Sequence, residues 1–447
     1  MKLRGEMFMD KMKDSGIKWI GDSPIDWNKF TIGQLFEQVK QKNTGLIEKN
    51  LLSLSYGRIK RKDINSGNGL LPESFEGYNI IEKDDIVLRM TDLQNDKTSL
   101  RQGIAEERGI ITAAYITMRA IHKVSPRFVY YQLYGFDISK GYYGMGSGVR
   151  QGVNWKDIKK LSLILPNLEL QNEIAKFLDE RTALIDEIIS DSKKSIEELK
   201  AYKQSLITEI VTKGLDPNVT LVPSGIDWIG DIPEGWEVVR SKNILSYSKG
   251  LSITKENLTE TGIPVINYGQ IHSKYPVYFN PRINQLPFVS NVYLESKKNA
   301  LLNQGDFVFA DTSEDISGSG NFSSLTSDGI VFAGYHTIIA RIIDKTRINY
   351  RFLAYYFSSE LHRKQVGSRV SGVKVFSISQ KILKSMLILL PNRDEQNSIA
   401  NYLDQKTAQI DTIIAEKENL IFEFESYKKS MIYEYVTGKK QVEGYES

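Results

Sequence analysis

Two short segments of the sequence share a motif in which one position carries a different hydrogen-bonding side chain in each copy. LSYGRI begins at Leu54 and INYGQI begins at Ile266; they share Tyr-Gly-x-Ile and differ at x, which is Arg58 in the first and Gln270 in the second. Arginine pairs best with guanine and glutamine with adenine in the major groove. A common backbone frame with a different side chain at its tip would suit a pair of base readers. The alternative is a plain turn whose next residue points into water.

Basic and aromatic residues surround these two segments. The first segment continues into Lys60, Arg61 and Lys62, whose charges could hold phosphates. Together with the tyrosine of each segment and the lysine that follows the second, they complete a first candidate set for DNA binding: Tyr56, Arg58, Lys60, Arg61, Lys62, Tyr268, Gln270 and Lys274.

A second pair of candidate loops precedes the last strand expected in each half. GSGVRQ from Gly146 corresponds to SGVK from Ser371, and glycine lets the backbone approach a ligand closely. A solvated hairpin tip explains the same pattern. The candidate residues in and beside these loops are Tyr143, Arg150, Arg369 and Lys374.

No set of residues has the spacing of a catalytic site. The absence of cysteine excludes disulfides, thiol nucleophiles and thiolate metal sites. The sequence has no GxxxxGK[ST] phosphate loop and no proline pair, so the Asn- or Asp-Pro-Pro-aromatic motif of amino-methyltransferases is missing. GMGSG from Gly144 follows a helix-like segment, which argues against a cofactor loop. Metal-ligand spacing is also missing from the four histidines, His122, His272, His336 and His362. We therefore predict no catalytic, cofactor or metal site.

Two long helical segments, which repeat each other, must position the candidate residues. LPNLELQNEIAKFLDERTALIDEIIS from Leu165 returns 225 positions later as LPNRDEQNSIANYLDQKTAQIDTIIA from Leu390. A second repeat opens each half, where SGIKWIGDSPIDW from Ser15 returns as SGIDWIGDIPEGW from Ser224. This self-similarity predicts two tandem copies of a unit of roughly two hundred residues.

Each long segment has an apolar seam with a seven-residue period, which is typical of a coiled coil. Some forty residues at about 1.5 Å each form a rod of roughly 60 Å. Antiparallel pairing of the two rods would bring the polar positions Ser192 and Lys417 together near the middle. On periodicity alone, a coiled coil for dimerisation is the alternative. The predicted seam consists of Leu178, Ile185, Leu199, Leu206, Leu403, Ile410, Phe424 and Met431.

The ends of both helices carry recognisable signals. Asn167 and Asn392 are placed to cap the two N-termini, and Glu395 could complete a capping box three residues after Asn392. Gly214, followed by Pro217, is expected to end the first helix.

Between these elements each half has a mixed α/β pattern. IIEKDDIVLRM, GIITAAYITMRAI and LSLILP are typical of strands, and PRFVYYQLYGF of a short amphipathic helix. The predicted fold class is α+β, with two mixed α/β heads in tandem and two long helices forming an antiparallel coiled coil. The predicted boundaries are an N-terminal segment at 1–14, a first head at 15–164, a first spacer helix at 165–214, a linker and second head at 215–389, a second spacer helix at 390–440 and a C-terminal tail at 441–447.

The overall charge is nearly balanced, at +3 from 58 basic and 55 acidic residues. Attraction to DNA would have to come from local patches, so we expect the isolated chain to bind DNA weakly and partner subunits to close around the duplex. No run of eighteen apolar residues is present to span a membrane, and the charged N-terminus does not look like a signal peptide. We therefore expect a cytoplasmic protein.

The duplicated motifs resemble those of the specificity subunit of type I restriction-modification enzymes. The residues that carry the resemblance are L-P-x-x-x-x-Q-N-x-I-A-x-x-L-D at each head-to-helix junction and W-I-G-D-x-P-x-x-W at the start of each repeat, and it extends from about Ser15 to Lys440. It implies that each head is a target-recognition domain reading one half of an asymmetric, bipartite site in double-stranded DNA. It further implies that the helices set the gap and dock two methyltransferase subunits, with restriction/translocase subunits joining outside.

The resemblance also implies that this chain catalyses nothing itself in the defence against foreign DNA. S-adenosylmethionine, ATP and Mg are expected on the partner subunits, and no cofactor is expected on this chain. Two alternatives are a non-catalytic duplicated scaffold with a coiled-coil spacer and a self-sufficient enzyme such as a fused methyltransferase. Sequence-specific retention on DNA would argue against the scaffold, and methyl transfer without partners would support the enzyme.

Overall fold

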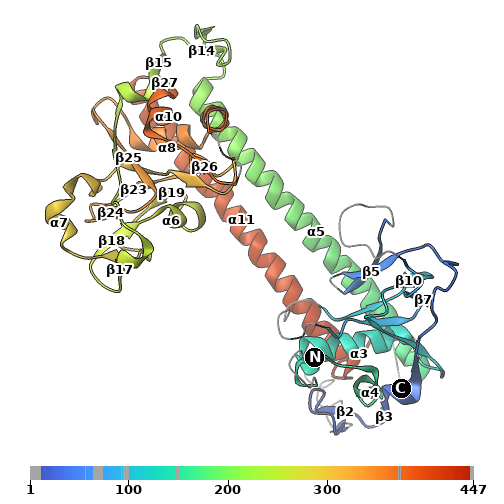
Figure 1. Cartoon of the computed structure of the whole chain (residues 1–447). Helices are drawn as coiled ribbons and strands as arrows, with labels where there is room; N and C mark the ends of the chain where they lie inside the picture. The colour runs from blue at the N-terminus through green and yellow to red at the C-terminus, as the bar shows by residue number, and fades with distance from the viewer. Residues whose placement is uncertain are drawn as a thin grey trace, which may run out of the picture. The chain divides into compact units, whose positions relative to one another are not determined.

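The computed structural model of the chain describes residues 12–55, 57–63, 74–91, 93, 100–145, 152–370, 372 and 374–442. The chain divides into two compact units, unit 1 with residues 1–192 and 418–447 and unit 2 with residues 193–417. The long helices are α5 (Leu168–Lys213) and α11 (Arg393–Val436), shown in green and red in Figure 1. Each unit therefore contains one head together with part of each long helix.

Unit 1 is built around a four-stranded antiparallel sheet in the order β4-β11-β8-β9. Strands β8 and β9 are buried along their whole length, and helix α3 packs its apolar residues into the same core. The elements of this head are β1 (Met12–Asp14), β2 (Asp22–Pro24), β3 (Asn28–Thr31), α2 (Ile32–Leu35), β4 (Phe36–Gln38), β5 (Leu52–Ser55), β6 (Arg58–Arg61), β7 (Asn79–Ile81), β8 (Ile86–Leu88), β9 (Gln102–Ile104), β10 (Gly109–Ile111), β11 (Ile116–Ala120), α3 (Pro126–Ile138), α4 (Trp155–Ile158) and β12 (Ser162–Leu165).

Unit 2 has a five-stranded sheet in the order β16-β25-β21-β23-β19 and a four-stranded sheet in the order β17-β20-β18-β24. Both contain one parallel pair, β19 with β23 and β18 with β24. The elements of this head are β13 (Leu221–Pro223), β14 (Asp231–Pro233), β15 (Glu237–Arg240), β16 (Leu245–Lys249), β17 (Leu258–Thr259), β18 (Ile263–Ile266), α6 (Tyr268–Ser273), β19 (Val277–Phe279), β20 (Phe288–Val289), α7 (Tyr293–Ser296), β21 (Phe307–Ala310), β22 (Thr312–Ser313), β23 (Phe322–Leu325), β24 (Phe332–Ala333), β25 (Thr337–Ile342), α8 (Tyr350–Ser358), α9 (Glu360–Gly367), β26 (Phe376–Ser377), α10 (Gln380–Ser385) and β27 (Leu387–Leu390).

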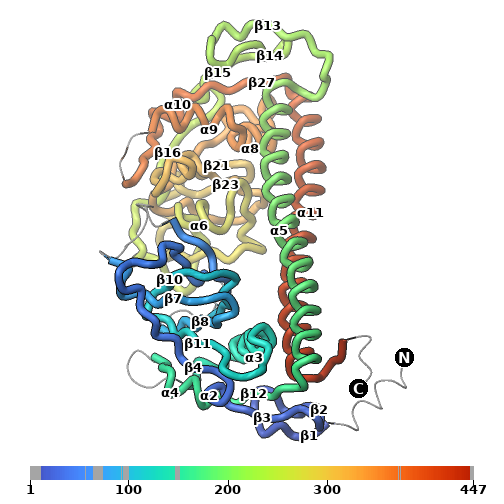
Figure 2. Tube along the Cα trace, turned by 90° about the vertical axis from the view of Figure 1, so that its right-hand side faces the viewer, coloured from blue at the N-terminus to red at the C-terminus, as the bar shows by residue number. Residues whose placement is uncertain are grey.

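The two longest predicted strands of unit 1 are each divided by a turn. IIEKDDIVLRM contains β7 and β8, because Asp84 adopts a left-handed conformation (φ 69°) and the Asp85 carboxylate accepts a hydrogen bond from the N–H of Glu82. Asp tolerates the left-handed region and caps its own turn. The predicted short helix is confirmed as α3, which lies beside the first part of α5 in both views (Figures 1 and 2).

The antiparallel pairing of the long helices is confirmed within each unit. In unit 1, Leu178 and Ile185 from the first half of α5 share a core with Met431 near the end of α11, and in unit 2 Leu206 near the end of α5 shares a core with Leu403 near the start of α11. Six of the eight predicted seam residues are buried, and Leu199 and Phe424 pack partly buried against the cores. The expected meeting of Ser192 and Lys417 stays a prediction, because the division between the units falls at these positions.

The expected helix caps are confirmed in part. The side chains of Asn167 and Asn392 accept hydrogen bonds from the N–H groups of Leu170 and Glu395, at 2.9 and 3.0 Å. The Glu395 carboxylate accepts a hydrogen bond from the indole N–H of Trp236 at 3.1 Å, and its part in a capping box stays a prediction. Gly214 ends α5 with a left-handed φ of 79°.

Candidate nucleic-acid interface

The first candidate segment forms a tight β-hairpin in unit 1. Strands β5 and β6 pair with Ser55 opposite Arg58, which leaves a two-residue connection that includes Gly57. Gly57 has a φ of 75°, and a Cβ there would come within 2.8 Å of Leu100. Glycine is therefore required both by the turn and by the close packing beneath it.

Arg58 begins strand β6 and forms an ion pair with Asp186 of α5. The other partner of Asp186 is Lys428 of α11, at 2.7 Å. The Arg58 side chain is nevertheless 63% exposed. The hairpin is thus fastened to the helices by a side chain that still reaches solvent, and its predicted contact with a base stays a prediction.

The three basic residues after Arg58 are all exposed. Arg61 is paired with Glu107, Nε lying 2.6 Å from the carboxylate. Lys60 and Lys62 have no ion-pair partner among the described residues, so their charges are available to an anion such as a phosphate. Tyr56 lies outside the described part of the chain.

The matching segment of unit 2 has a different local structure, so the common frame predicted for the two segments is wrong. Strand β18 ends at Ile266 and helix α6 begins at Tyr268. The N–H of Asn267 donates to the Gln270 side-chain oxygen at 3.0 Å, which closes a capping box and favours the helix. A bidentate contact with adenine would use both the oxygen and the nitrogen of the Gln270 amide, and in this structure the oxygen is already occupied by the cap.

Unit 2 contains an aromatic cluster that the sequence analysis missed. The Tyr268 ring lies edge-on to His272, Tyr335 and His336, with centroids 6.2, 5.8 and 5.4 Å away. His336 is exposed and its ring nitrogen lies 3.1 Å from the Asp311 carboxylate. The spacing of His272 and His336 in the sequence does not indicate this cluster. One feature of the sequence could have indicated this cluster, because Tyr335 occupies the same position as Tyr115 in the other half. Aromatic rings repeated in this way are candidates for stacking on bases.

The rest of this cluster is held by directed hydrogen bonds. The two ring nitrogens of His272 lie 2.8 Å from the carbonyl oxygen of Thr312 and 2.9 Å from the side-chain nitrogen of Asn321. Arg363 donates to the Asn321 oxygen at 2.7 Å. Lys274, at the end of α6, is exposed to solvent.

The second pair of candidate loops is described only in part, since Arg150 lies outside the described ranges. Tyr143 is half-buried between two cations, with Lys140 5.2 Å and Arg101 5.8 Å from its ring centroid. Arg369 is exposed and donates to the Gln365 carbonyl, and Lys374 is also exposed. In unit 1, Arg101, which lies beside the Tyr143 ring, directly follows Leu100, whose side chain packs beneath Gly57 of the hairpin.

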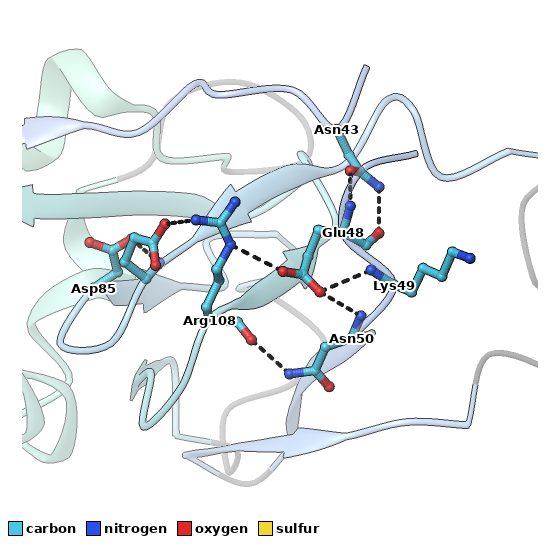
Figure 3. Close-up of polar contacts among 7 residues, drawn as sticks. Asn43, Glu48, Lys49, Asn50, Asp85 and Arg108 are labelled. Atoms are coloured by element: carbon cyan, nitrogen blue, oxygen red, sulfur yellow. Dashed lines mark hydrogen bonds and ion pairs between the residues drawn. The ribbon is translucent and has the colours of Figure 1, made fainter. Parts of the chain in front are cut away.

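A polar network supports the loop that leads into the β5–β6 hairpin (Figure 3). Asn43 and Glu48 exchange two hydrogen bonds of 2.9 Å between side chain and backbone. The Glu48 carboxylate accepts from the N–H groups of Lys49 and Asn50 and lies 3.1 Å from Arg108. The Asn50 N–H, assisted by Lys49 and Arg108, holds the pKa of Glu48 below its ordinary value of 4.5.

We expect Glu48→Gln to lower the free energy of unfolding of unit 1 by about 1–2 kcal/mol at pH 7. The folded state lowers the pKa, so the charged carboxylate stabilises the protein above pH 4.5 and this contribution is lost as the pH falls through the folded pKa. Urea unfolding at pH 7 and pH 4 should therefore show a smaller difference between wild type and variant at pH 4. Glu187→Gln, at an exposed position, is the control and should change neither value. An equal difference at both pH values would contradict this assignment.

The repeated junction motif fastens each head to its helix through a glutamine. Gln171 accepts a hydrogen bond from the N–H of Ser125 at 3.0 Å and donates to the carbonyl of Pro166 at 2.8 Å. Gln396 repeats this arrangement, accepting from Asn349 at 2.8 Å and donating to the junction proline at 2.9 Å. The motif therefore fixes the N-terminus of α3 or α8 against the start of the long helix.

An aspartate about two helical turns after each of these glutamines also holds the head to the long helix. In unit 1, Asp179 lies 2.7 Å from Arg127 and accepts a hydrogen bond from Tyr131 at 2.6 Å. Burial raises the pKa of the Tyr131 phenol, and Asp179 adds to the rise, so the tyrosine stays a donor. The same residue types recur in unit 2, with distances of 2.5 and 2.7 Å, as Arg351, Asp404 and Tyr355.

The long helices also expose matched apolar side chains. Ile188 and Ile413 are 40% and 42% exposed, and Tyr202 and Tyr427 are 58% and 56% exposed. We call Ile188 with Tyr427 the unit 1 helix patch, and Ile413 with Tyr202 the unit 2 helix patch. Large apolar residues repeated on a solvent-facing surface indicate an interaction site.

An ion pair close by in the sequence is also repeated. Lys428 pairs with Asp186 in unit 1 at 2.7 Å, and Lys203 pairs with Asp411 in unit 2 at 2.6 Å. In both units the isoleucine follows the aspartate by two positions and the tyrosine directly precedes the lysine. The same four residue types thus recur at matched positions of the two long helices.

Within the described ranges, no group of three or more His, Asp or Glu side chains is placed to hold a metal ion. None of the helices described is both long enough and apolar enough to span a membrane.

Comparison with protein families gives one match that is repeated along the chain. The type I restriction modification DNA specificity domain matches residues 24–198 and 233–422. The chain is 24% identical over 422 residues to the type I restriction enzyme MjaVIII specificity subunit of Methanocaldococcus jannaschii, with 94% of each protein covered. It is 25% identical over 446 residues to the putative type I restriction enzyme MjaX specificity subunit of the same organism, with 95% of this chain and 96% of the relative covered.

Solved structures with the same fold extend over nearly the whole chain. One, described as "Structural basis underlying complex assembly and conformational transition of the type I R-M system", has a TM-score of 0.69 at 16% identity and covers 94% of this chain and 99% of the other. The HsdS subunit from Thermoanaerobacter tengcongensis has a TM-score of 0.52 at 15% identity and covers 94% and 98%. At these identities the likeness concerns the fold.

Proposed function

Because this chain belongs to the type I restriction modification DNA specificity family, we propose that it selects the DNA sequence on which a type I restriction-modification complex acts. Each head reads one half of an asymmetric, bipartite site. The chain itself performs no chemistry; S-adenosylmethionine, ATP and Mg belong to partner subunits, and the complex works in the cytoplasm.

The observation that carries this proposal is the combination of identical junctions with different heads. The Gln171 and Gln396 junctions fasten the heads to the helices through the same hydrogen bonds. The surfaces beyond the junctions differ, a basic hairpin with Arg58 in unit 1 and an aromatic cluster around Tyr268 in unit 2. The same attachment to the helices combined with two different head surfaces suits two domains that recognise unlike half-sites. Phosphate contacts from residues such as Lys60 would fix the register.

The long helices supply the other two parts of the proposal, the gap and the docking of partners. Helix α5 has 46 residues, which at about 1.5 Å each gives a rod of roughly 70 Å, whereas one turn of DNA advances about 34 Å. The two helix patches have the same composition, which suits two copies of one partner. We assign them to two methyltransferase subunits, with restriction subunits joining outside.

The test is to co-express this chain with its cognate methyltransferase subunit and to map methylated adenines across a genome by single-molecule sequencing. We expect one asymmetric motif of two short half-sites with a fixed gap. The control is the methyltransferase subunit expressed alone, which should leave that motif unmethylated. A folded complex that leaves the methylation pattern unchanged would favour a scaffold without DNA specificity.

A further inference from the structure

The opening W-I-G-D motif of unit 1 is covered by the end of the chain. The Tyr433 hydroxyl donates to the carbonyl of Trp19 at 3.1 Å, and the Lys439 ammonium donates to the carbonyl of Ile20 at 2.7 Å. The Trp19 ring packs edge-on against Phe136, with centroids 5.7 Å apart. An aromatic ring, a phenol and an ammonium group thus close this motif.

The same motif in unit 2 lacks all three of these groups. Alignment of the two junctions places Glu360 where unit 1 has Phe136, and Thr208 where unit 1 has Tyr433. In unit 1 the glycine after α11 is followed by Lys439. In unit 2 the glycine after α5 is followed by Leu215. Trp228, the counterpart of the covered tryptophan, is 48% exposed.

A cavity of about 630 Å³ lies beside Trp228, wholly within unit 2. Its volume falls within the range of about 300–1,000 Å³ that is usual for ligand sites. Ile229, Leu361 and Leu389 give it apolar walls, and Lys364 and Glu360 form an ion pair of 3.0 Å at its edge. No described residue donates a hydrogen bond to the carbonyl oxygens of Trp228 and Ile229, whose counterparts in unit 1 are bonded.

From this difference we infer that the cavity beside Trp228 docks a side-chain pair of the methyltransferase subunit, one aromatic with a hydroxyl and one lysine. The inference rests on the proposed function. Unit 1 supplies its own tyrosine and lysine for the same backbone, and so defines the chemistry that the corresponding cavity in unit 2 accepts. A tryptophan inside a rim of mixed charge is also typical of the centre of a protein interface.

The asymmetry has a consequence for assembly. The helix patches occur twice, but in unit 1 the Tyr433 hydroxyl and the Lys439 ammonium bond the backbone that has no such donors among the described residues of unit 2. One of the two docked methyltransferase subunits therefore makes an additional contact, and the two copies bind with different affinities.

The experiment titrates the full chain with the cognate methyltransferase subunit in a calorimeter. For wild type we expect two binding events. Trp228→Ala should weaken one event at least tenfold and leave the other unchanged. Thr208→Tyr places in unit 2 the phenol that closes the motif in unit 1, and should give the same selective loss by filling the cavity. Ile283→Ala, at a residue that is 79% exposed and does not line the cavity, is the control and should change neither event.

The outcomes separate this inference from the proposed function. If wild type binds the subunit and directs methylation while both variants bind like wild type, the docking cavity is ruled out and the proposed function stands. If wild type neither binds the subunit nor directs methylation, the proposed function fails first. If Trp228→Ala changes only the self-association of this chain, the occupant is a second copy and the inference is wrong. Thermal unfolding of each variant verifies that unit 2 remains folded.

Discussion

Replacing Gln396 with alanine should lower the free energy of unfolding of unit 2 by about 2–4 kcal/mol. Gln396 is fully buried and its amide bonds three backbone groups, donating to Arg347 at 3.1 Å and to Pro391 at 2.9 Å and accepting from Asn349 at 2.8 Å. Alanine leaves these groups without partners in a dry environment. By contrast, an exposed ion pair such as Arg347 with Glu237 contributes about 0–1 kcal/mol, so the glutamine dominates this junction.

Urea unfolding of the full chain and amide hydrogen exchange measure this effect together. The Asn349 N–H should lose protection in Gln396→Ala, because its acceptor is removed. Gln171→Ala should have the same kind of effect on unit 1, where the glutamine accepts from Ser125. Gln304→Ala, at an exposed glutamine, is the control and should change stability by less than about 0.5 kcal/mol. Equal effects of Gln396→Ala and Gln304→Ala would show that the junction does not hold the head in place.

Replacing Arg58 with alanine should cost the assembled complex about 1–3 kcal/mol of affinity for its correct first half-site, the loss expected for a good base contact. Discrimination against changed bases in that half-site should fall by the same amount. The measurement is titration of duplexes that differ only in the first half-site, at one salt concentration. Lys60→Ala is the comparison: loss of a phosphate contact should weaken all duplexes alike and lower the salt slope by about 1.

The Arg58–Asp186 ion pair makes a second variant necessary. Asp186→Asn removes the carboxylate charge but keeps the arginine. Asp186 is also paired with Lys428 at a partly buried position, so we expect this change to lower the stability of unit 1, which urea unfolding measures separately. If Arg58 reads a base, Asp186→Asn preserves the half-site preference. Should Asp186→Asn instead reproduce the loss seen for Arg58→Ala, the arginine acts by positioning the hairpin and is not a base reader.

Repeated features of the sequence predicted the architecture well, because the same physical constraint acts on both copies. A seven-residue apolar period specifies which face of a long helix is buried, and the eight seam residues are buried or half-buried as expected. Asn167 and Asn392 were predictable as caps from their position alone. The glutamines of the junction were visible as repeated residues, but their backbone partners, such as Ser125, lie too far along the chain for local patterns to indicate.

The candidate interface was less predictable, because it depends on tertiary contacts of single side chains. The segments around Arg58 and Gln270 have similar sequences but form a hairpin and a helix. In the segment around Arg58, the close packing of Gly57 on Leu100 favours the turn. In the segment around Gln270, the hydrogen bond between Asn267 and Gln270 favours the helix. The pairing of Arg58 with Asp186 joins residues far apart in the sequence and has no local signature.

The composition of the units has a consequence for biosynthesis. Unit 1 includes residues 418–447, whereas unit 2 is the continuous segment 193–417. Gln132 in the first head, for example, donates to the carbonyl of Val436 at 2.8 Å. At about 5–20 residues per second, the ribosome needs on the order of ten to fifty seconds to pass from residue 193 to residue 442. The half that is translated first is therefore completed last, and a chain that stops before the second half of α11 lacks part of the core of its first head.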